Sequence, residues 1–480
     1  MKKRWITCTL LLLAFVMLLG SCTKEEPTGT TNTPPAGNEV ATSAYQDEVV
    51  TVDMGHREFV MMSQETYNQY NFFYGEDYTG DPINDTAYER ISYIEGRYNV
   101  AFEYKEVPAP AEALENESAS DKSAFDLLYP HPTTSMGKLL NNGLLTNLKT
   151  LEHLNLDRPW YAQSQVTNYE KNGYLLLATS DYSIVGQGIG GILFNRDFYT
   201  NLGNETDLYD MVYGGNWTLE NMGNIIKNAG TDTAGTGERE GYGFIMRQTA
   251  ANGFATASGQ NILVKNAEGD FALGFTTSMM SDIADAVNDM LITGGENVLT
   301  KDIRSNAEFM ASAEWELYKQ GKSLFITFDF GQLQSLLRDL SFDIGFLPYP
   351  TMTSTTDYRI RCGGGFFAIP AKAQSIEQSS IILESLSIYS YEYMRPEFFE
   401  TILLGRLSEN KADFDMLSYL QDHKYWDFGF TFDTKNVANY MLFNILFTYG
   451  DVRAVTTYWK GHKGEIEQIV TDANAFGLWG

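Results

Sequence analysis

Short apolar runs alternate with segments of helical periodicity along most of the chain. The apolar runs of the first third are residues 57–63, 100–104 and 124–129. Their length is that of buried strands. Between the first two, Asp81 and Pro82 form an N-cap with proline at the first helical position, and apolar residues recur at helical spacing over 87–98. A further helix is predicted over 135–142, where Gly143 ends it. This alternation predicts an α/β fold with a largely parallel sheet.

A second alternating unit is predicted from about residue 182. Its strands are predicted at residues 191–195, 243–246, 323–328 and 342–347. Thr218 is placed to cap a helix, and further helices are predicted over 307–320 and 332–340. From residue 378 onward the pattern is mostly helical. Because single cores stop growing at about 250–300 residues, a chain of 480 residues predicts two lobes.

The first residues have the pattern of a secretory signal peptide. Basic residues at positions 2–4 precede an apolar run over 10–19, which is too short to span a bilayer. The run ends in Leu-Gly-Ser followed by Cys22, which resembles the bacterial lipobox. In such signals the cysteine becomes the lipidated first residue of the mature protein. We therefore expect a signal peptide over 1–21 and a lipid anchor at Cys22, on the extracytoplasmic face of the cell membrane. The alternative is an ordinary signal peptide with an incidental cysteine.

A polar tether is expected between this anchor and the folded part. Residues 22–49 are rich in Thr, Pro, Gly and Glu and poor in large apolar side chains, so they cannot offset the entropy of ordering. No other apolar run reaches about 18 residues, so no transmembrane helix is expected. Beyond Cys22 only Cys362 remains, which predicts a fold without an intrachain disulfide.

Charge and aromatic content narrow the choice of ligand. The net charge is −28, and removal of the three basic residues of the signal leaves 31 basic and 62 acidic residues, or −31. This balance argues against a nucleic-acid partner and discourages anionic ligands. Aromatic residues make up 14% of the chain, with 29 Tyr and 29 Phe. Aromatic rings can cover the apolar faces of sugar rings, while Asp, Glu, Asn and Gln pair with their hydroxyls.

Several short motifs carry a resemblance to a known family. They are Tyr88–Val100, Gly143–Leu148, Leu193–Phe198, Trp217–Thr218, Ala313–Phe325, Asp343–Pro350 and Gly363–Pro370. Each is weak alone. Their order over residues 57–480, behind a lipobox, resembles the family 1 extracellular solute-binding proteins, the substrate-capturing lipoproteins of bacterial ABC importers, mostly for carbohydrates.

The resemblance implies a two-lobed, type II periplasmic-binding-protein-like fold of the maltodextrin-binding kind. Each lobe is then a mixed, mostly parallel sheet flanked by helices. The implied boundaries are residues 50–181 and 351–410 for lobe 1, and 182–350 and 411–480 for lobe 2, with hinge strands near 180–182 and 347–350. A carbohydrate would bind between the lobes, and a monomeric protein would close around it and deliver it to an ABC permease.

Candidate ligand contacts follow predicted strands, lie at the crossover between the lobes or, for Tyr440, come from the C-terminal helices. They are Gln64, Glu65, Tyr129, His131, Asp181, Tyr182, Gln248, Phe328, Asp329, Phe330 and Tyr440. Core packing is the alternative for Tyr129, Phe328 and Tyr440. Asp329 has the alternative of capping the helix predicted over 332–340. For Asp181 the alternative is a structural role at the hinge, and for Glu65 it is that of a solvated loop charge.

Some residues match the sequence patterns of catalytic or cofactor-binding motifs, but the predicted elements around them do not suit those motifs. Residues 186–191 fit G-x-G-x-x-G, but a strand follows where a dinucleotide site needs a helix. No two histidines are four residues apart, so neither zinc nor any other cofactor is expected. We therefore expect a binding protein without catalysis. The alternatives are a surface glycan hydrolase, whose carboxylate pair the sequence does not exclude, and a solute-binding protein for a non-sugar ligand such as a peptide.

Overall fold

The computed structural model describes most of the chain after its first 43 residues. The described residues are 44–65, 74–75, 77–117, 119–132, 136–204, 206–230, 241–329, 340–404 and 411–476. From Ala44 onward the chain is one compact unit. The predicted signal peptide, Cys22, the first part of the tether, Phe330 and all but the last residue of the helix predicted over 332–340 lie outside the described residues.

Three parallel strands form the first sheet, in the order β2-β1-β3. They span Arg57–Gln64 (β1), Val100–Val107 (β2) and Leu127–Tyr129 (β3). Along β1, Phe59 and Met61 belong to one buried cluster, whereas Val60 and Met62 belong to another. Both faces of this strand are therefore covered, which explains its uninterrupted apolar sequence. The three predicted strands are confirmed, although β3 begins three residues later than expected.

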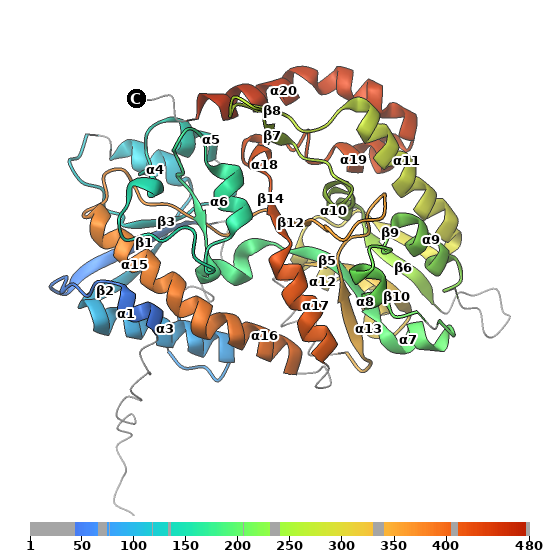
Figure 1. The fold of residues 1–480 in the computed structure, drawn as a ribbon, viewed down its shortest axis with the longest axis horizontal. Helices are drawn as coiled ribbons and strands as arrows, with labels where there is room; N and C mark the ends of the chain where they lie inside the picture. Colours follow the sequence, from blue (N-terminus) through green and yellow to red (C-terminus); the bar gives the residue numbers. More distant parts are fainter. Residues whose placement is uncertain are drawn as a thin grey trace, which may run out of the picture. The chain divides into compact units, whose positions relative to one another are not determined.

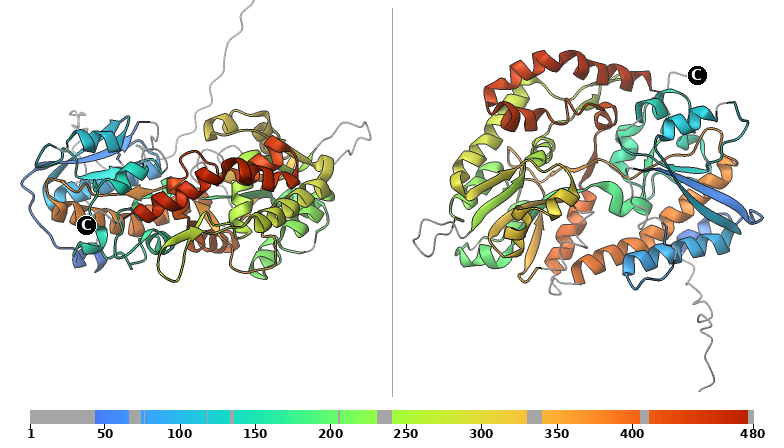
Figure 2. Two further views of the ribbon diagram at one scale, coloured as in Figure 1. Left: turned by 90° about the horizontal axis from the view of Figure 1, so that it is seen from above. Right: turned by 180° about the vertical axis from the view of Figure 1, so that it is seen from behind.

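Helices cover the first sheet and form with it what we call lobe 1 (Figures 1 and 2). They include α1 (Ala44–Glu48), α3 (Pro82–Tyr98), α4 (Pro110–Asn116), α5 (Met136–Asn141), α6 (Gln163–Tyr169), α15 (Ile376–Tyr389) and α16 (Arg395–Leu404). The predicted cap is confirmed, because the Asp81 carboxylate accepts the backbone N–H groups of Ile83 and Asn84 at the start of α3. Two short strands, β4 (Ala178–Thr179) and β13 (Phe366–Phe367), pair next to this sheet.

The second sheet has five strands in the order β11-β5-β10-β6-β9. They span Gly190–Asn195 (β5), Tyr242–Arg247 (β6), Val298–Lys301 (β9), Ser323–Asp329 (β10) and Ile344–Leu347 (β11). β10, β6 and β9 run parallel, whereas β5 is antiparallel to both β10 and β11. The sheet is therefore mixed, as expected. A strand follows the glycines of residues 186–191, so the dinucleotide motif is rejected by the structure as well.

Further helices surround this sheet and form lobe 2 with it (Figure 1). They include α7 (Arg196–Asn201), α8 (Leu208–Tyr213), α9 (Leu219–Lys227), α10 (Ala251–Ala257), α11 (Thr277–Gly294), α12 (Asn306–Met310), α13 (Ala313–Lys319) and α17 (Lys411–Asp422). Thr218 caps α9 as predicted. The single helix predicted over 307–320 is wrong. The segment forms α12 and α13, because Ser312 caps a new helix by accepting the N–H of Trp315.

The C-terminal segment passes between the two lobes, and its last helix ends beside α5 of lobe 1 (Figure 1). A strand, β14 (Lys424–Trp426), interrupts the predicted helical region and pairs with β12 (Ile360–Cys362). The remaining helices are α18 (Phe428–Phe432), α19 (Met441–Phe443) and α20 (Val455–Ala475). Within the described part of the chain, no helix combines the length and the apolar character that a membrane crossing requires.

Candidate functional site

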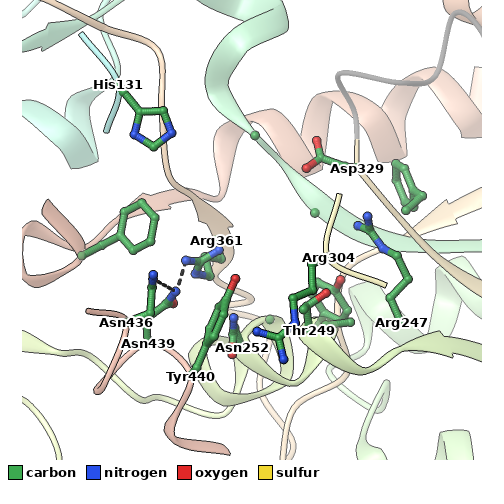
Figure 3. A pocket seen from close by; sticks show the side chains of 17 residues that line it. His131, Arg247, Thr249, Asn252, Arg304, Asp329, Arg361, Asn436, Asn439 and Tyr440 are labelled. Carbon is green, nitrogen blue, oxygen red and sulfur yellow. Dashed lines mark hydrogen bonds between the residues drawn. The ribbon is translucent and has the colours of Figure 1, made fainter. Parts of the chain in front are cut away.

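A cavity of about 320 Å³ opens where strands of both sheets end (Figure 3). In α/β sheets, ligands bind outside the carboxyl ends of the strands. Arg247 and Asp329 are the last residues of the parallel strands β6 and β10, and His131 follows β3 of lobe 1. The cavity is lined by His131, Gly188, Gly190, Arg247, Thr249, Ala250, Asn252, Gly253, Arg304, Phe328, Asp329, Tyr349, Arg361, Phe430, Asn436, Asn439 and Tyr440.

His131 is the lobe 1 residue that lines this cavity. In Figure 3 it lies across the open space from Asn252 and Tyr440. Partial burial lowers the pKa of His131 below its ordinary value of 6.5. The imidazole is therefore mostly neutral at pH 7, so it offers one N–H donor and one nitrogen acceptor.

Arg361 is held in place by its neighbours. Its Nη2 donates to Asn439 Oδ1 at 2.7 Å, and its guanidinium lies over the Phe430 ring at 4.7 Å. Asn439 Nδ2 in turn donates to Asn436 Oδ1 at 3.0 Å. Figure 3 shows these groups together at one end of the cavity. A ligand at Arg361 therefore meets a guanidinium whose orientation is already set, which lowers the entropic cost of binding.

The loop that carries Asn436 and Asn439 is fixed by a buried carboxylate. Asp433 accepts the backbone N–H groups of Val437, Ala438 and Asn439 at 2.7, 2.9 and 2.7 Å. Asn436 has φ of 56°, in the left-handed region that asparagine tolerates better than most residues. The backbone therefore presents both amides to the cavity without relying on a ligand.

Helix α10 forms another wall. Asn252 is only 6% exposed, and its Oδ1 has no hydrogen-bond partner in the described part of the chain. Gly253 follows, and a Cβ there would lie 2.2 Å from the Tyr349 ring. Glycine thus allows the ring to pack directly against the helix. The unpaired Asn252 oxygen is an acceptor for a donor that the protein does not supply.

Three guanidinium groups line the cavity against one carboxylate. Arg247 lies over the Phe309 ring at 5.0 Å. Arg304 donates to Asp302 at 3.0 Å and 3.2 Å, at the edge of the cavity. Among the described residues that line the cavity, Asp329 is the one acidic side chain. The local charge of the cavity is therefore opposite in sign to the net charge of the chain.

Two aromatic residues proposed from the sequence lie at this cavity. Phe328 lines it but is 1% exposed and also belongs to the core of lobe 2. Tyr440 is partly exposed, and its ring packs on Phe443 at 5.7 Å between centroids. Tyr440 therefore lines the cavity with a partly accessible ring and also packs against the core, which was the alternative for it.

Of the residues predicted to contact ligand, the structure brings His131, Phe328, Asp329 and Tyr440 to one cavity. Tyr129 and Tyr182 are instead buried against Phe367, with ring centroids 5.2 and 4.7 Å from it. Neither lines the cavity, so the structure places Tyr129 and Tyr182 in the core of lobe 1.

Three further candidates also lie away from the cavity lining. Gln64 is buried at the end of β1, and Glu65 is exposed beside it. Gln248 is turned toward β9, where its Nε2 donates to Thr300 Oγ1 at 3.4 Å. The two residues that flank Gln248 in sequence, Arg247 and Thr249, line the cavity instead.

Asp181 lies at a different cavity, of about 360 Å³. Its carboxylate is 3.4 Å from Arg395 at the start of α16, and burial raises the pKa of Asp181 despite this partner. Trp160 and Trp426 also line this second cavity. Its place between the crossover and α16 agrees with the structural alternative for Asp181.

Sequence reasoning missed most of the polar lining. Arg247 could have been found, because it directly ends the predicted strand over 243–246. Arg361 and Asn439 are 78 positions apart and are joined by the fold alone, so no local pattern points to them. None of the described His, Cys, Asp and Glu side chains form a group of three or more that could hold a metal ion.

Solved structures share this architecture. The GacH receptor of Streptomyces glaucescens, determined unliganded and with acarbose, has a TM-score of 0.55 at 12% identity, over 86% of this chain and 99% of the other. UgpB from Mycobacterium tuberculosis, in complex with glycerophosphocholine, has a TM-score of 0.55 at 15% identity, over 87% and 99%. A family 1 extracellular solute-binding protein from Bifidobacterium longum subsp. infantis has a TM-score of 0.53 at 12% identity, over 85% and 100%. No protein-family model and no curated protein matches the chain.

These likenesses confirm the predicted fold class. The chain has the two-lobed α/β fold of the family 1 extracellular solute-binding proteins, as the order of its motifs indicated. At 12–15% identity the likeness concerns the fold, so the function has to be argued from the cavity itself.

Proposed function

We propose that the protein is a non-catalytic, extracytoplasmic solute-binding protein that captures a carbohydrate between its lobes and delivers it to an ABC permease. The observation that carries this proposal is the cavity at the ends of β3, β6 and β10. It combines the partly exposed ring of Tyr440 with a set of amide, guanidinium and imidazole groups. An apolar face next to convergent hydrogen-bonding groups is the chemistry that binds a sugar ring and its hydroxyls.

The unpaired oxygen of Asn252 supports a hydroxyl-bearing ligand in particular. A buried acceptor without a donor costs free energy, and a ligand hydroxyl that donates to it would remove this cost. Among the similar structures, the GacH receptor was solved with acarbose. Carbohydrate is therefore the ligand class that the lining and the comparison both favour.

A glycan screen followed by thermal shift tests the proposal. At tenfold to hundredfold saturation a true ligand stabilises the protein by roughly 1.4–2.7 kcal/mol. The Tyr440→Ala variant should lose most of the ligand-dependent shift. Tyr449→Ala is the matched control, because Tyr449 is exposed and does not line the cavity.

The same samples separate the rival classes. Each stabilising oligosaccharide is recovered after incubation and analysed by mass spectrometry. Intact sugar supports the transport function, whereas cleavage by the wild-type protein supports a glycan hydrolase and rejects the proposal. Stabilisation by peptides with none by sugars would support the non-sugar alternative.

We further propose a lipid anchor and delivery of the sugar to a permease, on the basis of the sequence pattern around Cys22. The lipobox predicts diacylglycerol and acyl chains on this cysteine. We expect Cys22→Ser to release the protein from membranes, and mass spectrometry to find acyl groups on the wild-type N-terminal peptide only. Permease delivery predicts that deletion of the gene abolishes uptake of the bound sugar, and normal uptake would contradict it.

A further inference from the structure

We propose that the ligand of this cavity is an acidic saccharide, whose carboxylate, sulfate or phosphate group binds at Arg361. The inference rests on the proposed function and specifies the substrate class of the same cavity. Two observations carry it: the excess of guanidinium groups among the described lining residues, with Arg361 at one end of the cavity, and the unpaired acceptor of Asn252.

The charges of the lining residues favour an anion. In the described part of the lining, Arg247, Arg304 and Arg361 accompany one carboxylate, that of Asp329. Asp302 compensates Arg304 from outside the lining. The three guanidinium groups outnumber the carboxylates of Asp329 and Asp302 by one, and we assign this remaining positive charge to Arg361. In a chain with a net charge of −28, random placement of charges would not be expected to produce a cationic cavity.

Arg361 has no ion-pair partner in the described part of the chain. Its polar contact is the amide oxygen of Asn439, and its other contact is the Phe430 face. Desolvation lowers its pKa, which shows that its surroundings disfavour the charge. The nearby Asp427 is committed to the backbone N–H groups of Ile262, Leu263 and Gly429. A ligand anion would therefore restore a charge interaction that the protein leaves open.

The guanidinium geometry also suits an oxyanion. Arginine presents planar, paired N–H donors that match carboxylate, sulfate and phosphate oxygens. Asn439 and Phe430 already fix the plane of Arg361. A simple inorganic anion would leave the rest of the cavity without contacts. Asn252 Oδ1 needs a hydroxyl or amine donor, and Tyr440 offers an apolar face, so the anionic group belongs to a hydroxyl-bearing ring.

The test is a titration of the purified full-length protein with matched pairs of saccharides. The pairs are an oligouronide with its methyl ester, a sulfated oligosaccharide with its desulfated form, and a sugar phosphate with the free sugar. We expect one acidic member to bind at least about tenfold more tightly than its neutral partner, because a charge-assisted hydrogen bond contributes more than a neutral one. The pair that responds identifies the anionic group. Its affinity should fall as salt is raised.

Arg361→Met then locates the contact. It should lower affinity for the acidic saccharide at least about tenfold and leave the neutral form within threefold. Arg361→Lys should retain more of the affinity than Arg361→Met. Arg359→Met is the matched control, since Arg359 donates to Asn261 Oδ1, stacks on Tyr425 and does not line the cavity. Denaturant unfolding of each unliganded variant shows whether it is folded.

The outcomes separate this inference from the function on which it rests. Neutral saccharides that bind as tightly as their acidic partners would overturn the inference and leave the proposed function intact. Equal losses of affinity in Arg361→Met and Arg359→Met would also overturn it. If no saccharide of either kind binds, the proposed function fails and the inference fails with it.

Discussion

Asn252 provides a prediction in which stability and binding change in opposite directions. Its Oδ1 is buried without a donor, in a side chain that is 94% buried. An unpaired buried acceptor costs about 1–3 kcal/mol. The Oδ1 atom is itself closed to solvent, and we take the lower end of this range because other atoms of the side chain border the cavity. Asn252→Leu has a similar size and removes the acceptor, so the unliganded protein should gain about 1 kcal/mol in its free energy of unfolding.

Binding should weaken in the same variant. A neutral hydrogen bond contributes about 0.5–1.5 kcal/mol, so affinity for the saccharide should fall roughly three- to tenfold. The gain in stability is measured by denaturant unfolding followed by tryptophan fluorescence, and the loss of affinity by isothermal titration. The substitution leaves the backbone carbonyl of residue 252, which accepts the Thr256 hydroxyl at 3.1 Å, in place.

A matched control separates the two effects. Ser379 in α15 is fully buried, and its hydroxyl also has no partner in the described part of the chain. Ser379→Ala should raise stability by a similar amount and leave binding unchanged, because Ser379 lies outside the cavity. The reasoning is refuted if Asn252→Leu lowers stability by 1 kcal/mol or more while affinity stays the same. That result would assign Asn252 a structural role.

Two further predictions concern the walls of the cavity. Gly253→Ala places a Cβ 2.2 Å from the Tyr349 ring, so it should lower the free energy of unfolding by about 1–3 kcal/mol and weaken binding. The control is Gly461→Ala in α20, where a Cβ would have no atom within 4 Å, and it should raise the free energy of unfolding by about 0.5–1 kcal/mol. Equal effects of the two substitutions on unfolding would contradict the packing argument. Burial raises the pKa of Asp427 to about 6 from 3.8, so the folded state binds its proton more tightly than the unfolded state and this group's contribution to stability increases as pH falls from 7 toward 4. Between pH 7 and pH 5 the gain is about 1 kcal/mol, and unfolding curves of wild type and Asp427→Asn should diverge accordingly; parallel curves would show that Asp427 does not titrate in this range.

Local patterns were sufficient for much of the fold. The run of apolar residues in β1 reflects burial on both faces, and the adjacent residues Asp81 and Pro82 were enough to predict the start of α3. The same local reasoning failed at residues 307–320, where apolar spacing continues through the position at which Ser312 starts a new helix. Apolar residues keep their helical spacing across the point where one helix ends and the next begins, so this spacing alone does not reveal the boundary.

The cavity was harder to predict than the fold. Residues at or shortly after strand ends, such as Asp329 and His131, could be predicted to line the cavity because strand ends gather at one edge of a sheet. The same rule placed Tyr129 at the site, although the side chain of a strand's last residue can equally point into the core, as it does here. The contact between Arg361 and Asn439 depends on how β12 and the C-terminal loop meet, which no local signal encodes.

A crystal structure of the protein with the saccharide that binds most tightly would locate the ligand. We predict ligand density in the cavity between His131 and Asn252, with a ring against Tyr440 and an anionic group at Arg361. Density in the second cavity, beside Asp181, would reject this site, because it would assign binding to groups that we interpret as structural.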